Sequence, residues 1–221
     1  GTEGDPIIVG GEPARSIEIH SILPESIDGF PWAGHLGLRM YEELVARLNP
    51  GVSTLLFTNT RNQSERWHQC LRFACPEMED ALALHHSAID RSEREAIEAA
   101  VKAGGIRWVV CTSSLDLGVD FQPVEQVVQI GSPKNLARLL QRAGRSAHLP
   151  GGTSQVLFMP TNALELLELS AVRRGLEDGL VEQRKPPIAP MDVLLQHLTS
   201  LACGPGFDPD RTLESLSLIH I

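Results

Sequence analysis

The feature that most constrains the fold is the alternation of short apolar segments with longer segments of helical periodicity. Strands are expected at 16–23, 53–58, 81–85, 107–112, 126–130 and 155–159, and helices at 38–48, 62–74, 91–103, 135–143 and 162–175. Such an alternation predicts an α/β fold with a parallel sheet and helices on both of its faces. Ligands of these sheets bind at the carboxyl ends of the strands, so the segments that follow strands are the candidate sites.

Residues typical of helix ends flank the helix expected at 91–103. Asp90 precedes it as a candidate N-cap, and Glu93 follows three residues later, as in a capping box. Gly104 and Gly105 provide the stop, because glycine readily adopts the conformation that ends a helix. We therefore expect a well-defined helix between two strands.

The alternation ends after Met159, and this change marks a domain boundary. A segment rich in proline and charge covers 184–190, and a helix is expected at 191–202. We expect an N-terminal linker at 1–14, an α/β domain at 15–182, and a linker with the start of a second, helical domain at 183–221. The last residues, 216–221, fit no expected element.

Composition narrows the class of protein. Hydrophobic residues make up 42% of the chain, enough for a packed core. No apolar run approaches the roughly 20 residues of a membrane helix, and the N-terminus lacks a signal-peptide pattern. Four cysteines in a chain of this length are too few for a disulfide framework. A cytoplasmic protein is expected. The net charge of −9 argues against strong non-specific binding of nucleic acid by this chain alone.

Three segments that follow strands, at 55–61, 110–121 and 141–148, together resemble motifs IV, V and VI of superfamily 2 helicases. The segment 84–87 is similar to the element that these enzymes place between motifs IV and V. The resemblance covers about residues 16–160. It implies the second RecA-like domain of a helicase, with a parallel sheet flanked by helices.

The motif VI segment supplies the candidate catalytic residues. Transfer of a phosphoryl group needs positive charge on its oxygens, and an arginine from a facing domain can provide it. The resemblance implies that Arg145 is the first arginine finger. Arg142 is expected either to face the same cleft or to be a surface charge. His148 stands where the family usually has a second arginine, and an imidazole is only partly charged near neutral pH.

The resemblance also assigns nucleotide contacts. It places Gly118 and Asp120 near the ribose of the nucleotide, and Gln141 on the nucleotide side of motif VI. ATP and Mg²⁺ are expected to be bound mainly by another domain. The sequence has no Gly-x-x-x-x-Gly-Lys-Ser/Thr loop, and the Glu79–Asp80 pair precedes a strand instead of following one. The chain is therefore expected to be inactive by itself.

Thr60, Arg61 and Thr112 are the expected contacts to the nucleic-acid strand. Hydroxyls, guanidinium groups and backbone amides hold phosphates without selecting bases. The alternative for each threonine is that of an ordinary helix cap or turn residue.

Other clusters point to structure more than to chemistry. His68, Cys70 and Cys75 lack the spacing of a zinc knuckle, so no metal site is expected. His85 and His86 are expected to close a strand, in a structural or cleft-lining role. The segment 30–37 is either an aromatic anchor for the entry loop or a mark of a subfamily, since it resembles the bacterial ligase-associated DExH-box branch of the large helicase-related proteins.

The branch resemblance extends to 189–194, which is similar to the start of a winged-helix domain. It implies an ATP-dependent DNA helicase with a part in DNA repair. The expected partners are single-stranded or partly duplex DNA, a first RecA-like domain and the rest of the winged-helix domain, and no membrane is expected. Two alternatives stay open: a non-catalytic RecA-like binding or scaffold module, and an RNA helicase.

Overall fold

The structure is a computed structural model, and it describes residues 17–24, 26, 30–32, 36–116, 124–146, 154–180 and 190–217. The chain divides into two compact units, Gly1–Glu182 and Gln183–Ile221. The linker expected at 1–14 lies outside the described residues.

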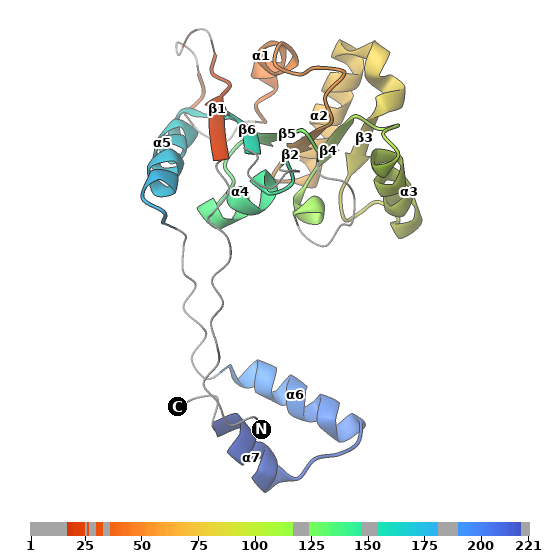
Figure 1. The fold of residues 1–221 in the computed structure, drawn as a ribbon, viewed down its shortest axis with the longest axis vertical. Helices are drawn as coiled ribbons and strands as arrows, with labels where there is room; N and C mark the ends of the chain where they lie inside the picture. Colours follow the sequence, from red (N-terminus) through yellow and green to blue (C-terminus); the bar gives the residue numbers. More distant parts are fainter. Residues whose placement is uncertain are drawn as a thin grey trace. The chain divides into compact units, whose positions relative to one another are not determined.

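The first unit contains a parallel sheet in the order β1-β6-β5-β2-β4-β3 (Figure 1). Its strands are β1 (Ile17–Ser21), β2 (Thr54–Phe57), β3 (Leu82–His85), β4 (Trp108–Cys111), β5 (Gln126–Ile130) and β6 (Ser154–Met159). Every neighbouring pair is parallel, so the carboxyl ends of the strands meet at one edge. The predicted α/β fold with a parallel sheet is confirmed.

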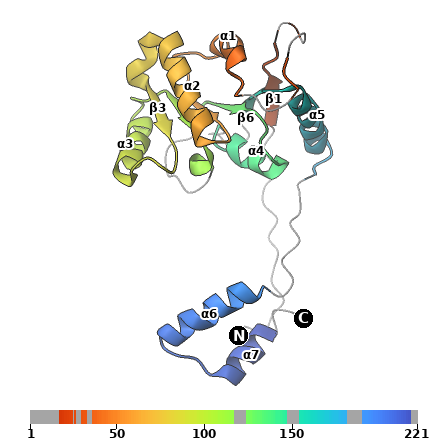
Figure 2. The ribbon, with the colours of Figure 1, turned by 180° about the vertical axis from the view of Figure 1, so that it is seen from behind.

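Helices connect the strands. They are α1 (Tyr41–Val45), α2 (Arg61–Ala74), α3 (Arg91–Lys102), α4 (Leu136–Ala143) and α5 (Ala163–Glu177), with short 3₁₀ helices η1 (Leu38–Met40), η2 (Pro76–Ala81) and η3 (Ser113–Leu115). Figures 1 and 2 show α5 beside β1 at one end of the sheet and α3 beside β3 at the other. The predicted helices lie within a few residues of these bounds. The 3₁₀ helices η2 and η3 were not expected.

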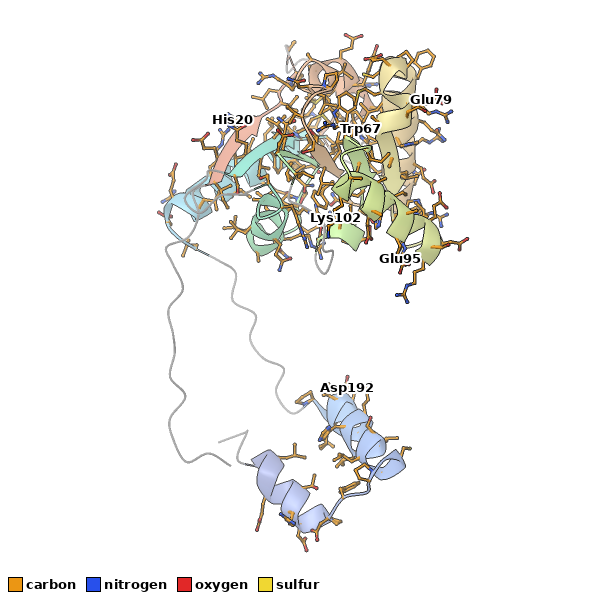
Figure 3. The ribbon with its side chains drawn as sticks, turned by 45° about the vertical axis from the view of Figure 1, so that its right-hand side comes forward. His20, Trp67, Glu79, Glu95, Lys102 and Asp192 are labelled. Carbon is orange, nitrogen blue, oxygen red and sulfur yellow. The ribbon has the colours of Figure 1, made fainter. Side chains whose placement is uncertain are left out.

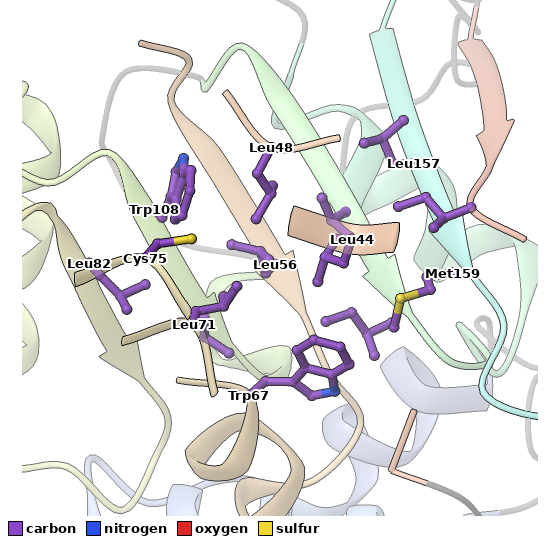
Figure 4. Close-up of a cluster of buried hydrophobic side chains, with 14 of the residues drawn as sticks. Leu44, Leu48, Leu56, Trp67, Leu71, Cys75, Leu82, Trp108, Leu157 and Met159 are labelled. Carbon is purple, nitrogen blue, oxygen red and sulfur yellow. The ribbon is translucent and has the colours of Figure 1, made fainter. Parts of the chain in front are cut away.

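Alternate residues of β2, β4, β5 and β6 pack into two separate clusters, one on each face of the sheet. The first cluster includes Leu56 of β2, Trp67 of α2 and Trp108 of β4, together with α1 (Figure 4). The second includes Leu55 of β2 and Leu139 of α4. This division follows from the two-residue period of a strand, since neighbouring side chains point to opposite faces.

Side-chain caps fix where several helices begin. Thr60 accepts a hydrogen bond from the amide of Gln63 at 3.1 Å, and Asn135 accepts one from the amide of Arg138 at 2.7 Å. These caps satisfy amides that have no partner inside the helix. Asp90 occupies the N-cap position of α3, but its side chain makes no cap hydrogen bond. The expected capping box is therefore wrong, although α3 begins where the sequence predicted.

The second unit contains α6 (Met191–Cys203) and α7 (Pro209–Ser217). None of the side chains described in it is buried, and Met191, Val193 and Leu195 are exposed. The helix expected at 191–202 corresponds to α6. The sequence did not predict α7, which includes two of the terminal residues that fitted no expected element.

Many charged side chains lie at the periphery of the first unit. Figure 3 shows Glu79 and Glu95 projecting outward, whereas Trp67 lies inside the fold. None of the described helices is both long enough and apolar enough to cross a membrane.

Candidate nucleotide and nucleic-acid site

Arg142 of α4 is buried, with 1% of its surface exposed. Its Nε donates to Oδ1 of Asp116 at 2.8 Å, and its Nη1 donates to Oε1 of Gln129 at 2.5 Å. The guanidinium also lies over the ring of Phe57, 4.6 Å from the centroid. The surface-charge alternative for Arg142 is wrong. The guanidinium does not face a cleft either, because these contacts hold it inside the domain.

Arg145 lies just beyond the end of α4 and is half-buried. Its Nη2 donates to the backbone carbonyl of Asp116 at 3.0 Å. Its own carbonyl accepts from the amide of Val124, which precedes β5, so its backbone is fixed as well. Arg145 is thus held against the segment that follows β4, the predicted motif V.

Of the three predicted nucleotide contacts, Gln141 lies within the described residues. Gln141 is exposed on α4. Gly118, Asp120 and His148 lie outside the described residues, so their predicted roles stay predictions.

Thr60 and Arg61 lie at the start of α2, immediately after the carboxyl end of β2, and both are exposed. Thr60 is the N-cap of α2, which matches the alternative of an ordinary cap residue. A cap uses the hydroxyl as an acceptor and does not prevent its proton from reaching a phosphate. Arg61 pairs with Glu65 at 3.2 Å on the helix surface. Exposed pairs of this kind contribute little stability, so the guanidinium can exchange partners.

Thr112 follows β4, next to β2 in the sheet, and is half-buried. Its amide donates to the carbonyl of His85 at 3.3 Å. Since β2 and β4 are parallel neighbours, the three predicted strand contacts lie at the same edge of the sheet. The structure therefore brings together Thr60, Arg61 and Thr112.

His85 closes β3 and joins two other elements. Its Nδ1 lies 2.8 Å from Oγ of Ser114, and its Nε2 lies 3.1 Å from Oε1 of Glu98 in α3. Burial lowers the pKa of His85, and the bond to Glu98 opposes this effect. The predicted structural role of His85 agrees with these contacts.

His86 is also buried, and its Nε2 lies 3.4 Å from Oε1 of Glu65. The same oxygen pairs with Arg61, so the first turn of α2 is connected to the end of β3.

Burial affects the three residues that were weighed as possible zinc ligands. Burial lowers the pKa of His68 and raises the pKa values of the thiols of Cys70 and Cys75. Within the part of the chain that the structure describes, no three or more His, Cys, Asp or Glu residues gather as a metal site would require.

Residues of the segment 30–37 differ in how deeply they are buried. Phe30 packs against the first apolar cluster, as expected for an anchor, and the carbonyl of Leu36 accepts from Nε1 of Trp67 at 2.9 Å. Trp32, in contrast, is 78% exposed. Residues 33–35 lie outside the described residues.

A surface groove of about 440 Å³ lies between the start of α4 and α5. It is lined by Pro133, Lys134, Asn135, Leu136, Glu168, Ala171, Val172, Gly175 and Leu180. None of the predicted site residues is among them, so this groove is separate from the candidate site.

Sequence reasoning missed Asp116 and Gln129, which hold Arg142. Both carry a signal. Gln129 is a polar residue in the otherwise apolar end of β5, and Asp116 stands between two leucines in the motif V segment. Buried polar residues need partners, so each could have been suspected of an internal contact.

Comparison with protein families agrees with this arrangement. The family model described as "Helicase conserved C-terminal domain" matches residues 38–149, and the model "Large helicase-related protein, winged helix domain" matches residues 174–220. The first match covers the predicted strand contacts and the arginines of α4, and the second covers both helices of the second unit.

Curated relatives are similar over nearly the whole chain. ATP-dependent helicase Lhr-Core protein 2 of Thermococcus barophilus is 33% identical over 94% of this chain and 24% of its own length. ATP-dependent helicase Lhr-Core of Methanocaldococcus jannaschii is 32% identical over 96% of this chain and 25% of its own length. The chain thus spans about a quarter of the length of these relatives.

A solved structure shares the fold. The helicase Lhr of Mycobacterium smegmatis, bound to ssDNA and AMP-PNP, matches 86% of this chain and 25% of its own with a TM-score of 0.72 and 26% identity. The chain therefore belongs to the helicase conserved C-terminal domain family, in the large helicase-related branch of superfamily 2, with the fold of the second RecA-like domain.

Proposed function

We propose that this chain is the second motor domain of an ATP-dependent DNA helicase or translocase, and that Arg145 is its arginine finger. The relatives are ATP-dependent helicases of which the chain spans about a quarter, which leaves room for a first RecA-like domain in the same protein. We call this chain joined to that first RecA-like domain the complete motor.

The placement of Arg145 carries the proposal. Arg145 is half-buried just beyond the end of α4, and its Nη2 donates to the carbonyl of Asp116. Arginine has five N–H donors, so a bond from one of them is compatible with a contact to phosphate through others. A guanidinium fixed in advance stabilises the charge of a transferring phosphoryl group without reorganisation.

ATP and Mg²⁺ are proposed to bind mainly to the first domain, with Gln141, Gly118 and Asp120 on the facing wall. His148 is proposed as a second, weaker positive group beside Arg145.

The nucleic-acid contacts are proposed at the carboxyl edge of the sheet, at Thr60, Arg61 and Thr112. Their shared edge supports this, as does the single-stranded DNA bound to the similar mycobacterial helicase. By the same resemblance we propose single-stranded or partly duplex DNA as substrate, a bacterial and cytoplasmic setting, and a role in DNA repair. Residues 183–221 are proposed as the linker and start of the winged-helix domain.

Strand-stimulated ATP hydrolysis tests the proposal. In the complete motor, Arg145→Ala should lower kcat by about 10³ to 10⁵ and change strand affinity far less. His148→Ala should cost about tenfold, because a partly charged imidazole or a single hydrogen bond stabilises the phosphoryl group less than a guanidinium does. The chain by itself should not hydrolyse ATP. Arg91→Ala is a matched control, since Arg91 is an exposed arginine of α3 paired with Glu95.

Three outcomes would overturn parts of the proposal. Hydrolysis by the chain alone, or a near-normal rate for Arg145→Ala, would reject the finger. A complete motor that binds a strand but never hydrolyses ATP would favour the scaffold alternative. Stronger stimulation by RNA than by DNA of the same sequence would favour an RNA helicase.

Arg61→Ala tests the strand contact separately. This variant should weaken binding of single-stranded DNA and leave kcat at saturating strand unchanged, because the side chain lies on α2 and not on α4. Arg72→Ala at the other end of α2 is the control. Equal affinities of the two variants would remove Arg61 from the site.

A further inference from the structure

Three arginines, two of α4 and one just beyond its end, contact Asp116. Nε of Arg142 donates to Oδ1 of Asp116 at 2.8 Å, and Nε of Arg138 lies 3.5 Å from Oδ2. Nη2 of Arg145 donates to the backbone carbonyl of the same residue at 3.0 Å. One aspartate is therefore bound through its side chain by two arginines of α4 and through its backbone by the third.

Asp116 is fixed more firmly than a surface residue. It is buried, with 6% of its surface exposed, and Arg142 is held in turn by Gln129 of β5 and the ring of Phe57 of β2. Hydrogen bonds between ionised partners are stronger and more directional than neutral ones, and the planar fork of arginine restricts the carboxylate further. The side chain of Asp116 thus anchors its own backbone to the sheet.

This anchoring reaches Arg145 directly. The carbonyl that accepts from Arg145 belongs to the residue whose carboxylate is bound by Arg142. Loss of the hold on the carboxylate therefore leaves the backbone that carries the acceptor of the finger free to shift. Displacement of a catalytic group by about 1 Å can cost on the order of 10² in rate. The acceptor is a backbone atom, so it persists in every variant and only its position changes.

We propose that Asp116 is a positioning residue for Arg145, which acts through the finger and does not itself touch the nucleotide. This inference rests on the proposed function of Arg145. It assigns Arg142 to the same role, as the cation that holds Asp116 in place. Neither residue is expected to contact the nucleotide or the strand.

A double-mutant cycle in the complete motor tests the inference. Asp116→Asn should lower kcat by about 10²-fold and leave KM for ATP nearly unchanged, because the lost interaction matters in the transition state. In the Arg145→Ala background the same substitution should have little further effect, since the group it positions is absent. Glu95→Gln, which breaks an exposed ion pair on α3, is the control and should leave kcat unchanged.

A merely structural role would give another pattern. If the effects of Asp116→Asn and Arg145→Ala multiply, or if Asp116→Asn alone is near normal, Asp116 does not position the finger. If Arg145→Ala itself is near normal, the proposed function fails instead, so the two failures are distinguishable.

A second variant keeps the test open if Asp116→Asn does not fold. Arg142→Lys retains a buried cation beside Asp116 but loses the two-pronged hold on its carboxylate. It should lower kcat in an otherwise normal background and have little effect in the Arg145→Ala background. A multiplicative effect of this variant would overturn the inference as well.

Discussion

The two faces of the sheet are covered in different ways. On the face of α1 and α2, large apolar side chains such as Trp67 and Trp108 fill the space, and their indole N–H groups reach backbone carbonyls. On the face of α4 and α5, apolar side chains surround the buried ion pair of Arg142 and Asp116. The first face needs only volume and apolar surface, whereas the second also needs a fixed geometry of charges.

This difference indicates where function constrains the fold. Removing two charges from water costs free energy, which their attraction offsets only when the geometry is good, so a buried ion pair is weak evidence for stability. The pair lies beside Arg145 and the motif V segment. We infer that its geometry serves the site.

The largest loss of stability is expected on the apolar face. Trp67→Ala should reduce the free energy of unfolding by about 3–5 kcal/mol, through lost burial and a residual cavity. Urea unfolding followed by circular dichroism measures it. Phe73→Ala is the matched control, because Phe73 lies on the same helix and is 91% exposed, and it should change stability by less than about 0.5 kcal/mol. Similar losses for both variants would contradict this account of the face.

A somewhat smaller loss is expected on the charged face. Arg142→Met should destabilise the domain by about 3 kcal/mol, at the low end for a broken buried pair, since Arg138 still lies near the Asp116 carboxylate. Adding Asp116→Leu should restore much of the stability, because no unpaired charge then remains. The same double variant should stay catalytically impaired in the complete motor. Recovery of both stability and kcat would mean that the charges serve no function.

The two faces also differ in how well the sequence predicts them. The strands and both apolar clusters follow from local periodicity, so β5 was predicted at its observed bounds. The burial of Arg142 depends on Asp116 and Gln129, which lie 26 and 13 residues away in sequence. Helical spacing places Arg142 near Arg145, but it does not decide whether the guanidinium faces a cleft or the sheet.

Motif resemblance went further than periodicity at the site. It grouped Thr60, Arg61 and Thr112, which the parallel order of β2 and β4 brings to one edge. It named Arg145 but not the residue that holds it, because a motif gives residue types in order and not the contacts between them. The missing capping bond of Asp90 has a similar cause, since the spacing of a capping box does not fix the side-chain rotamer.

The edge of the sheet provides a pH-dependent prediction that involves neither face. Burial lowers the pKa of His85 in the folded state, so the unfolded chain binds more protons as the pH falls through the ordinary histidine value. The stabilising contribution of neutral His85 should be fully present above about pH 6.5 and should be lost below it. His85→Gln should flatten this part of the stability profile, whereas His20→Gln, which replaces an exposed histidine of β1, should not. A profile unchanged by His85→Gln would show that another group causes the acid sensitivity.

The smallest expected effects concern the helix starts, where the two faces should behave alike. Thr60 caps α2 on the apolar face, and Asn135 caps α4 on the charged face, each through one side-chain hydrogen bond to a backbone amide. Thr60→Ala and Asn135→Ala should each cost about 1 kcal/mol in urea unfolding. Asp90→Ala should cost less, because Asp90 makes no cap bond. A much larger loss of stability for Asn135→Ala than for Thr60→Ala would mean that the two faces differ in the whole of α4, and not only in the ion pair of Arg142 and Asp116. Equal losses would instead confine that difference to Arg142 and Asp116.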